Sequence, residues 1–193
     1  MRQWRLIYDY PAVGAWNMAV DEAILAAVSQ GTQPPTLRLY AWEPFCLSLG
    51  YGQRAADADI DLLNEHGWHL VRRPTGGRAI LHGDELTYSV ALSMDHELAQ
   101  GDVVTSYRQL SQALMYALGE LGIVPQAEKQ NIYSQRENGP ICFEVPSHYE
   151  ITILGRKLIG SAQVRRKQGL LQHGTLPLKG DVGRIAQALA FPH

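Results

Sequence analysis

Hydrophobic and polar positions repeat along the chain in short segments, whose spacing predicts a mixture of strands and helices. Residues 4–9 alternate as a strand does, and apolar residues in 17–29 and 105–121 recur at helical spacing. Further helices are predicted over 57–66 and from Asp181 onward. Further strands are predicted over 36–42, 46–50, 68–73, 78–81, 86–93, 148–154, 157–164 and 170–176.

The connections between these segments indicate how the chain turns. Turns are expected at Glu43-Pro44, between the strands 36–42 and 46–50, and at 74–77, while the polar stretch 126–140 is expected to be a loop. Helices mixed with largely antiparallel strands predict an α+β fold, in a single domain over 1–193. The last helix stops abruptly at 191–193, which suggests a missing C-terminal segment.

Composition excludes several classes of function. The net charge of -2 gives no basic face for nucleic acid, and no apolar run of about 18 residues predicts a membrane span. The first residues do not resemble a signal peptide, so a cytoplasmic protein is expected. The two cysteines and the scattered histidines do not form a disulfide framework or a zinc site, and no metal or cofactor is expected.

A glycine turn flanked by arginines is the first candidate for chemistry. In the segment 72–82, Gly76 and Gly77 allow a ligand to approach the backbone closely, and Arg72, Arg73 and Arg78 surround them. The ordinary alternative is a tight hairpin with solvated arginines. A phosphate-cradling loop is excluded, because no Gly-Lys-Ser/Thr ending follows.

Two further candidates are a thiol and an amine. Cys142 precedes a Pro-Ser turn, and Lys157 begins a strand in which alternation groups it with Ile159 and Ser161, while Gly160 lies on the other face. Taken alone, a single cysteine is more often a small buried apolar residue than a nucleophile. A lysine beside a turn is likewise more often solvated.

Together these segments resemble one superfamily, which contains lipoate ligases, biotin ligases and octanoyltransferases. The resemblance is carried by 17–23, 72–82, 157–163 and 171–176, which spread over most of the chain. It implies a class II tRNA synthetase and biotin ligase-like catalytic domain. The Gly-Arg-Gly-Arg type loop of biotin ligases is absent, which argues against that branch.

Within the superfamily, two features resemble the LipM-type octanoyltransferase branch. The segment Cys142-Phe143-Glu144-Val145-Pro146-Ser147 is similar to the nucleophile segment of that branch. Gly76-Gly77-Arg78 departs from the Gly-Gly-Gly usual in ATP-using ligases. The resemblance implies transfer of octanoyl from octanoyl-acyl carrier protein to Cys142. The acceptor would then be a lipoyl-domain lysine, such as that of the glycine-cleavage H protein or a 2-oxoacid dehydrogenase E2 subunit.

The resemblance also assigns roles to the candidate residues. Lys157 would favour the thiolate and accept a proton from the incoming amine. Gly76, Gly77 and Gly160 would let the backbone run beside the acyl chain, and backbone N–H groups there or at Ser161 would hold the oxyanion. His82 and His173 would shape the site or serve only the core. The arginines at 72, 73 and 78 would meet the carrier protein, its phosphopantetheine phosphate or the acceptor.

Three alternatives remain open from the sequence. An ATP-dependent lipoate–protein ligase would use Lys157 and need no cysteine. A lipoyl amidotransferase would share the Cys142 and Lys157 chemistry. A non-catalytic relic of the fold is the third alternative, and the presence of both residues argues against it.

Overall fold

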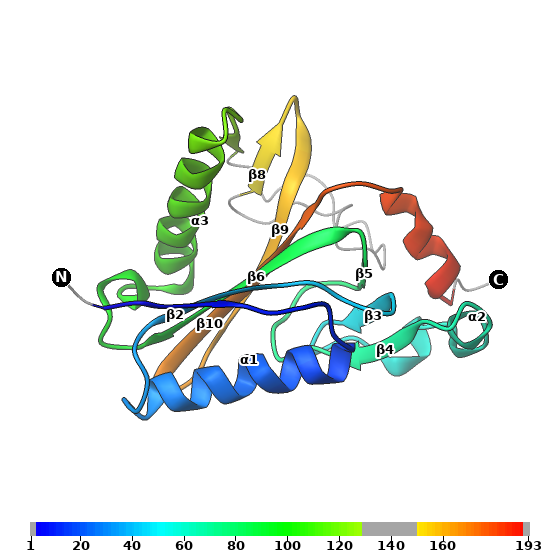
Figure 1. The fold of residues 1–193 in the computed structure, drawn as a ribbon, viewed down its shortest axis with the longest axis horizontal. Helices are drawn as coiled ribbons and strands as arrows, with labels where there is room; N and C mark the ends of the chain where they lie inside the picture. Colours follow the sequence, from blue (N-terminus) through cyan, green and yellow to red (C-terminus); the bar gives the residue numbers. More distant parts are fainter. Residues whose placement is uncertain (1–2, 129–149, 191–193) are drawn as a thin grey trace.

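The computed structural model describes residues 3–128 and 150–190 (Figure 1). Its helices are α1 (Gly14–Ser29), α2 (Ile60–Glu65) and α3 (Val103–Glu120), with 3₁₀ helices η1 (Ala55–Asp57), η2 (Glu97–Ala99) and η4 (Val182–Ala188). Its strands are β1 (Arg5–Tyr8), β2 (Thr36–Tyr40), β3 (Cys46–Leu49), β4 (His69–Arg72), β5 (Ile80–His82), β6 (Glu85–Ser93), β7 (Gln126–Glu128), β8 (Glu150–Ile153), β9 (Arg156–Arg165) and β10 (Gly169–Pro177).

A seven-stranded sheet forms the centre of the fold, in the order β1-β2-β6-β10-β9-β8-β7. The β1–β2 pair is parallel and the other pairs are antiparallel. The expected α+β class, with a mixed, largely antiparallel sheet and flanking helices, is confirmed. Strand β7 lies within a stretch expected to be a loop, and the last helix is a 3₁₀ helix rather than an α-helix.

Alternation along β6 and β10 divides the large sheet into two faces. Ala91 and Leu171 pack with residues of α1, whereas the next residues in the alternation, Leu92 and Leu170, belong to the cluster that contains Leu110 of α3. Because successive strand residues point to opposite faces, α1 and α3 cover opposite faces of the sheet (Figure 1). The face toward α1 also carries the second, smaller sheet.

The small sheet has the order β4-β3-β5. The strands 36–42 and 46–50 were expected to be neighbours around Glu43-Pro44, but β2 belongs to the large sheet and β3 to the small one. The burial of β3 explains this, because all four of its residues are buried. Leu47 and Leu49 pack toward η4, while Cys46 packs with Met18 of α1. Strand β3 is therefore covered on both sides, by η4 on one side and by α1 on the other.

The glycine turn does not close a hairpin, which was the ordinary alternative considered for it. Strands β4 and β5 lie on either side of β3, so the chain at 73–79 crosses the end of β3. This crossing brings the backbone against Gly50, where a β-carbon would lie 1.9 Å from the carbonyl oxygen of Gly77. Glycine at position 50 is therefore required by close backbone contact.

A buried guanidinium ties α1 to the large sheet. Arg38 of β2 is fully buried and donates to Asp9, at 2.7 Å, and to Asp21, at 2.8 Å. It also donates to the side-chain oxygen of Asn17 at 2.9 Å. Removing one partner from a buried pair of this kind typically costs about 3–5 kcal/mol. Within the described part of the chain, no helix is long and apolar enough to cross a membrane.

We predict that Gly50→Ala destabilises the protein by about 1–3 kcal/mol, because the new methyl group would overlap a backbone carbonyl that has little freedom to move. Urea unfolding of both proteins measures this difference. Gly52→Ala is the matched control, since a β-carbon there meets nothing within 4 Å. Equal unfolding midpoints for the two variants would contradict the packing described for the turn.

Candidate active site

A narrow pocket lies between the two sheets. Met18 of α1 and residues of both sheets enclose it, and its surface is mainly apolar. The lining residues are Met18, Tyr40, Trp42, Ser48, Arg73, Ile80, His82, Thr87, Gly160, Ser161, Ala162, His173, Gly174 and Thr175. Its mainly apolar surface suits an apolar group rather than a charged one.

Five residues singled out in the sequence meet at this pocket: Arg73, His82, Gly160, Ser161 and His173. They come from β9, β10, β5 and the glycine-turn connection, so segments far apart in the sequence converge here. Small residues allow the strands to form its wall, since a β-carbon on Gly174 would lie 2.6 Å from the Gly160 carbonyl. Gly76 and Gly77 are exposed and do not line the pocket.

His82 is held by a buried carboxylate. Its Nδ1 lies 2.5 Å from Oε1 of Glu85, and its Nε2 lies 2.8 Å from Oγ of Ser48. Burial by itself raises the pKa of Glu85, but the charge of His82 and hydrogen bonds from His82, Thr175 and Thr87 more than offset this and lower it. Glu85 is therefore ionised at neutral pH. The His-x-x-Glu spacing of His82 and Glu85 was the sequence signal that could have identified Glu85.

Trp42 forms a further part of the wall that sequence reasoning missed. Its indole stacks on the His82 ring with 4.0 Å between centroids and 9° between planes. Its Nε1 donates to the Thr87 hydroxyl at 2.8 Å. A tryptophan at the end of a predicted strand carries no sequence signal for this position, because both contacts depend on tertiary packing.

His173 links the glycine-turn connection to the large sheet. Its Nε2 lies 2.6 Å from Oγ1 of Thr75, and its Nδ1 lies 3.4 Å from Oδ2 of Asp21. Burial lowers the pKa of His173, so the ring is neutral at physiological pH. Burial by itself raises the pKa of Asp21, but its hydrogen bonds with His173 and Ser89 and the charge of Arg38 bring it below the usual value.

The three arginines at the glycine turn differ in their burial and in their hydrogen bonds to backbone carbonyl oxygens. Arg73 is buried and donates to the carbonyl oxygens of Gly76 and Arg78 and to Ser48. It therefore supports the turn from inside, which corrects the expectation that it meets a carrier or acceptor surface. Arg72 is exposed but donates to three carbonyl oxygens in 50–53, and Arg78 is half-buried.

Lys157 lies at a bulge in β9. Ile151 is opposite Ile159 while Thr152 is opposite Lys157, so β9 carries one extra residue. Leu158 and Ile159 consequently both pack in the cluster on the α3 face. Because the alternation is broken there, we infer that Lys157 lies on the face of Gly160, opposite to the expected grouping with Ile159 and Ser161. Bulges commonly redirect a side chain in this way.

The two cysteines differ in their suitability as nucleophiles. Cys46 is fully buried against Gly14 and Trp42, and burial raises the pKa of its thiol to about 12. A thiol of this kind is inert at neutral pH. Cys142 lies outside the described residues, so its distance from Lys157 stays a prediction.

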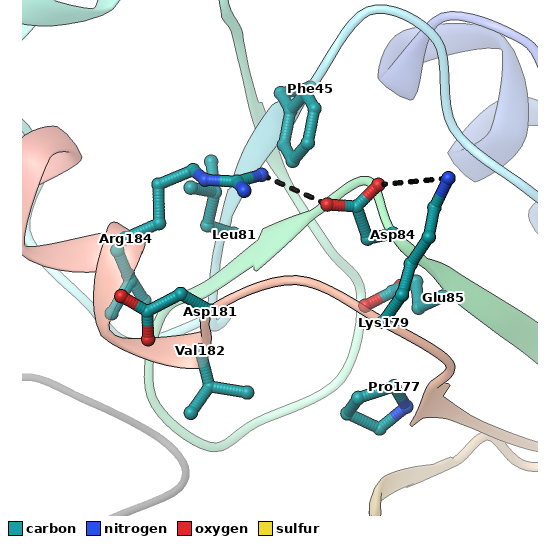
Figure 2. Close-up of a pocket in the computed structure, with 10 residues that line it drawn as sticks. Phe45, Leu81, Asp84, Glu85, Pro177, Lys179, Asp181, Val182 and Arg184 are labelled. Carbon is teal, nitrogen blue, oxygen red and sulfur yellow. Dashed lines mark hydrogen bonds and ion pairs between the residues drawn. The ribbon is translucent and has the colours of Figure 1, made fainter.

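A second hollow, of about 480 Å³, lies on the outer side of β5 and β6 (Figure 2). Three of its charged groups form ion pairs, since Asp84 meets Arg184 at 3.0 Å and Lys179 at 3.9 Å. None of the site residues expected from the sequence lines this hollow. We therefore place the candidate site between the sheets.

Comparison with known proteins adds independent information. A family model described as the lipoyl protein ligase A/B catalytic domain matches residues 14–193. The octanoyltransferase LipM of Kyrpidia tusciae is 45% identical over 197 residues, covering 100% of this chain and 72% of the relative. That of Clostridioides difficile is 43% identical, covering 96% of this chain and 69% of the relative.

Solved structures agree with this relationship. A bi-partite lipoate protein ligase from Thermoplasma acidophilum, described with its E2 lipoyl domain, has a TM-score of 0.80 and 26% identity, covering 100% of this chain and 68% of that one. A lipoate-protein ligase A bound with ATP has a TM-score of 0.80 and 27% identity, covering 98% and 72%.

We predict that iodoacetamide leaves Cys46 unmodified in the folded protein. With a pKa of about 12, its thiolate fraction at pH 8 is about one in ten thousand, and burial also blocks access. Peptide mass spectrometry after brief labelling measures the modification at each cysteine. Protein unfolded in urea is the control, in which both cysteines react; modification of Cys46 in the folded protein would contradict its packing.

Proposed function

The chain belongs to the lipoyl protein ligase A/B catalytic domain family, and within it to the octanoyltransferases, and from this membership we propose how it transfers the octanoyl group. The donor is octanoyl-acyl carrier protein, the nucleophile is Cys142 and the acceptor is the target lysine of a lipoyl domain. The resemblance inferred from the sequence is thereby confirmed at the level of family and acyl transfer.

The pocket between the sheets is the observation that carries this proposal. It is mainly apolar, and Gly160 in its wall lies three residues along β9 from Lys157. The six methylenes of an octanoyl chain would gain about 5 kcal/mol from burial, at about 0.8 kcal/mol for each. We propose that the chain lies in this pocket, with its carbonyl toward Lys157.

The reaction follows in two steps of similar type. The thiolate of Cys142 attacks the thioester carbonyl, the bond from carbon to the pantetheine sulfur breaks, and that sulfur leaves as a thiolate and takes a proton. The lysine amine of the acceptor then attacks the acyl-cysteine. An amide forms, and the Cys142 sulfur leaves. The amide is more stable than the thioester, so this second step drives transfer.

Lys157 is proposed to serve both steps. As a cation it stabilises the thiolate of Cys142, and as a neutral amine it accepts the proton of the attacking lysine. It is half-buried, so less water surrounds its ammonium group than at a fully exposed position. The bulge in β9 supports this role, because it moves Lys157 to the face of the pocket.

The named relatives bear on two points, namely the acceptor protein and the ATP-dependent alternative to acyl transfer. The archaeal ligase described with an E2 lipoyl domain supports an acceptor of that kind, of which the glycine-cleavage H protein is another example. The ATP-bound ligase keeps an ATP-dependent reaction as the second candidate. Alignment of the whole of this chain with octanoyltransferases, together with the inert Cys46, favours transfer through Cys142.

We predict that octanoyl-carrier protein acylates the enzyme without ATP or magnesium, because the thioester already carries the activation. Intact-protein mass spectrometry should show one added octanoyl group, which peptide mapping places at Cys142. Cys142→Ser should lose both the adduct and transfer, while Cys46→Ala serves as the matched control and keeps them. Transfer that requires ATP and free octanoate would instead assign the chain to the ligases.

We predict that Lys157→Arg impairs transfer to the lipoyl domain more than acylation of Cys142. Arginine keeps the positive charge but does not deprotonate in proteins, so it cannot accept the proton of the attacking amine. Loss of a general base typically costs about 10²–10⁴-fold. Single-turnover measurements separate the two steps. A slow first step followed by transfer at the wild-type rate would limit Lys157 to an electrostatic role.

A further inference from the structure

Glu85 is a buried carboxylate that the proposed transfer chemistry does not use. It lies at the start of β6, borders the outer hollow rather than the pocket between the sheets, and accepts hydrogen bonds from three side chains. The donors are Nδ1 of His82 at 2.5 Å, Oγ1 of Thr87 at 2.8 Å and Oγ1 of Thr175 at 2.7 Å. All three donors belong to residues that line the pocket.

Two stacked rings of the pocket wall depend on this carboxylate. Glu85 holds the His82 ring directly and reaches Trp42 through the Thr87 hydroxyl, which accepts from Trp42 and donates to Glu85. The stacked rings are nearly parallel, with 9° between their planes, so one can turn only if the other moves. One anion therefore sets the orientation of both rings.

Glu85 also sets the direction of a hydrogen-bond chain. An ionised carboxylate only accepts, so Nδ1 of His82 must carry a proton. The other ring nitrogen, Nε2, lies 2.8 Å from the Ser48 hydroxyl. The Ser48 oxygen accepts a hydrogen bond from Arg73 at 3.0 Å. Each polar group from Glu85 to Arg73 therefore has a hydrogen-bond partner.

We propose that Glu85 is a positioning residue that determines which acyl chains the pocket accepts. It acts by holding His82 in the Nδ1-protonated form and by fixing the stacked His82 and Trp42 rings as one rigid wall. This inference rests on the proposed function, because it takes the pocket as the site of the acyl chain. A rigid wall admits one chain shape, whereas a wall that can rotate admits several.

The test uses Glu85→Gln, which keeps the size of the side chain but adds amide donors. When the amide nitrogen faces His82, Nδ1 becomes an acceptor and the ring proton moves to Nε2. Imidazole ¹⁵N NMR detects this exchange of tautomer, which loss of packing alone would not produce. Competition between octanoyl- and decanoyl-carrier protein should show the preference for octanoyl falling by about tenfold, within the range that pocket contacts give per methylene.

Asp84→Asn is the matched control, because Asp84 neighbours Glu85 but pairs with Lys179 and Arg184 on the outer surface (Figure 2). It should keep both the His82 tautomer and the wild-type chain preference. If Glu85→Gln does not fold, Thr175→Val removes one donor to Glu85, keeps the carboxylate and should lower the preference in the same direction.

The outcomes separate this inference from the proposed function. If the wild-type protein forms no octanoyl-enzyme, the proposed function fails. If the wild type is acylated and folded Glu85→Gln keeps the wild-type chain preference, the selectivity role of Glu85 is overturned. Where Glu85→Gln does not fold, an unchanged chain preference in Thr175→Val overturns it. A changed chain preference in folded Glu85→Gln without any change in the His82 ¹⁵N shifts would overturn the positioning mechanism.

Discussion

Two buried imidazoles connect the small sheet to the large sheet, and the pocket depends on them. His82 of β5 meets Glu85 of β6, and His173 of β10 meets Thr75 of the glycine-turn connection. An unpaired polar group in such a place would typically cost about 1–3 kcal/mol. The sheets must therefore stay at the separation at which these groups remain paired, and the pocket lies between them.

This constraint explains how a site rich in polar residues can accept an apolar chain. The polar atoms of His82, Glu85 and Arg73 are directed toward one another or toward the backbone. The pocket surface is consequently mainly apolar, although many of its lining residues are polar. The same pairing makes the walls rigid, and a rigid wall suits both the selection of a chain and the placing of its reactive carbonyl.

The sequence alone predicted most of the elements, because strand alternation and helical spacing are local properties. The strand 86–93 and the helix 105–121 correspond closely to β6 and α3. The assignment of neighbouring strands to different sheets was not predictable, since burial of β3 on both sides depends on η4 and α1. The bulge at Lys157 was missed because its cause is the pairing with β8.

The residues of the candidate site were also predicted in part from the sequence. His82, His173 and Gly160 were identified through the resemblance, and the structure brings them to one pocket. Arg73 was expected at a surface, because nothing local indicates that its guanidinium binds the turn from inside. Trp42 and Ser48 carry no motif, so only the tertiary structure reveals them as part of the wall.

A crystal structure of the octanoyl-enzyme would test most directly the claim that the space between the sheets holds the acyl chain. We predict electron density for the acyl chain between Gly160 and Trp42, with His82 and Glu85 still paired. Density for the chain in the outer hollow beside Asp84, with the space between the sheets unfilled, would contradict it (Figure 2).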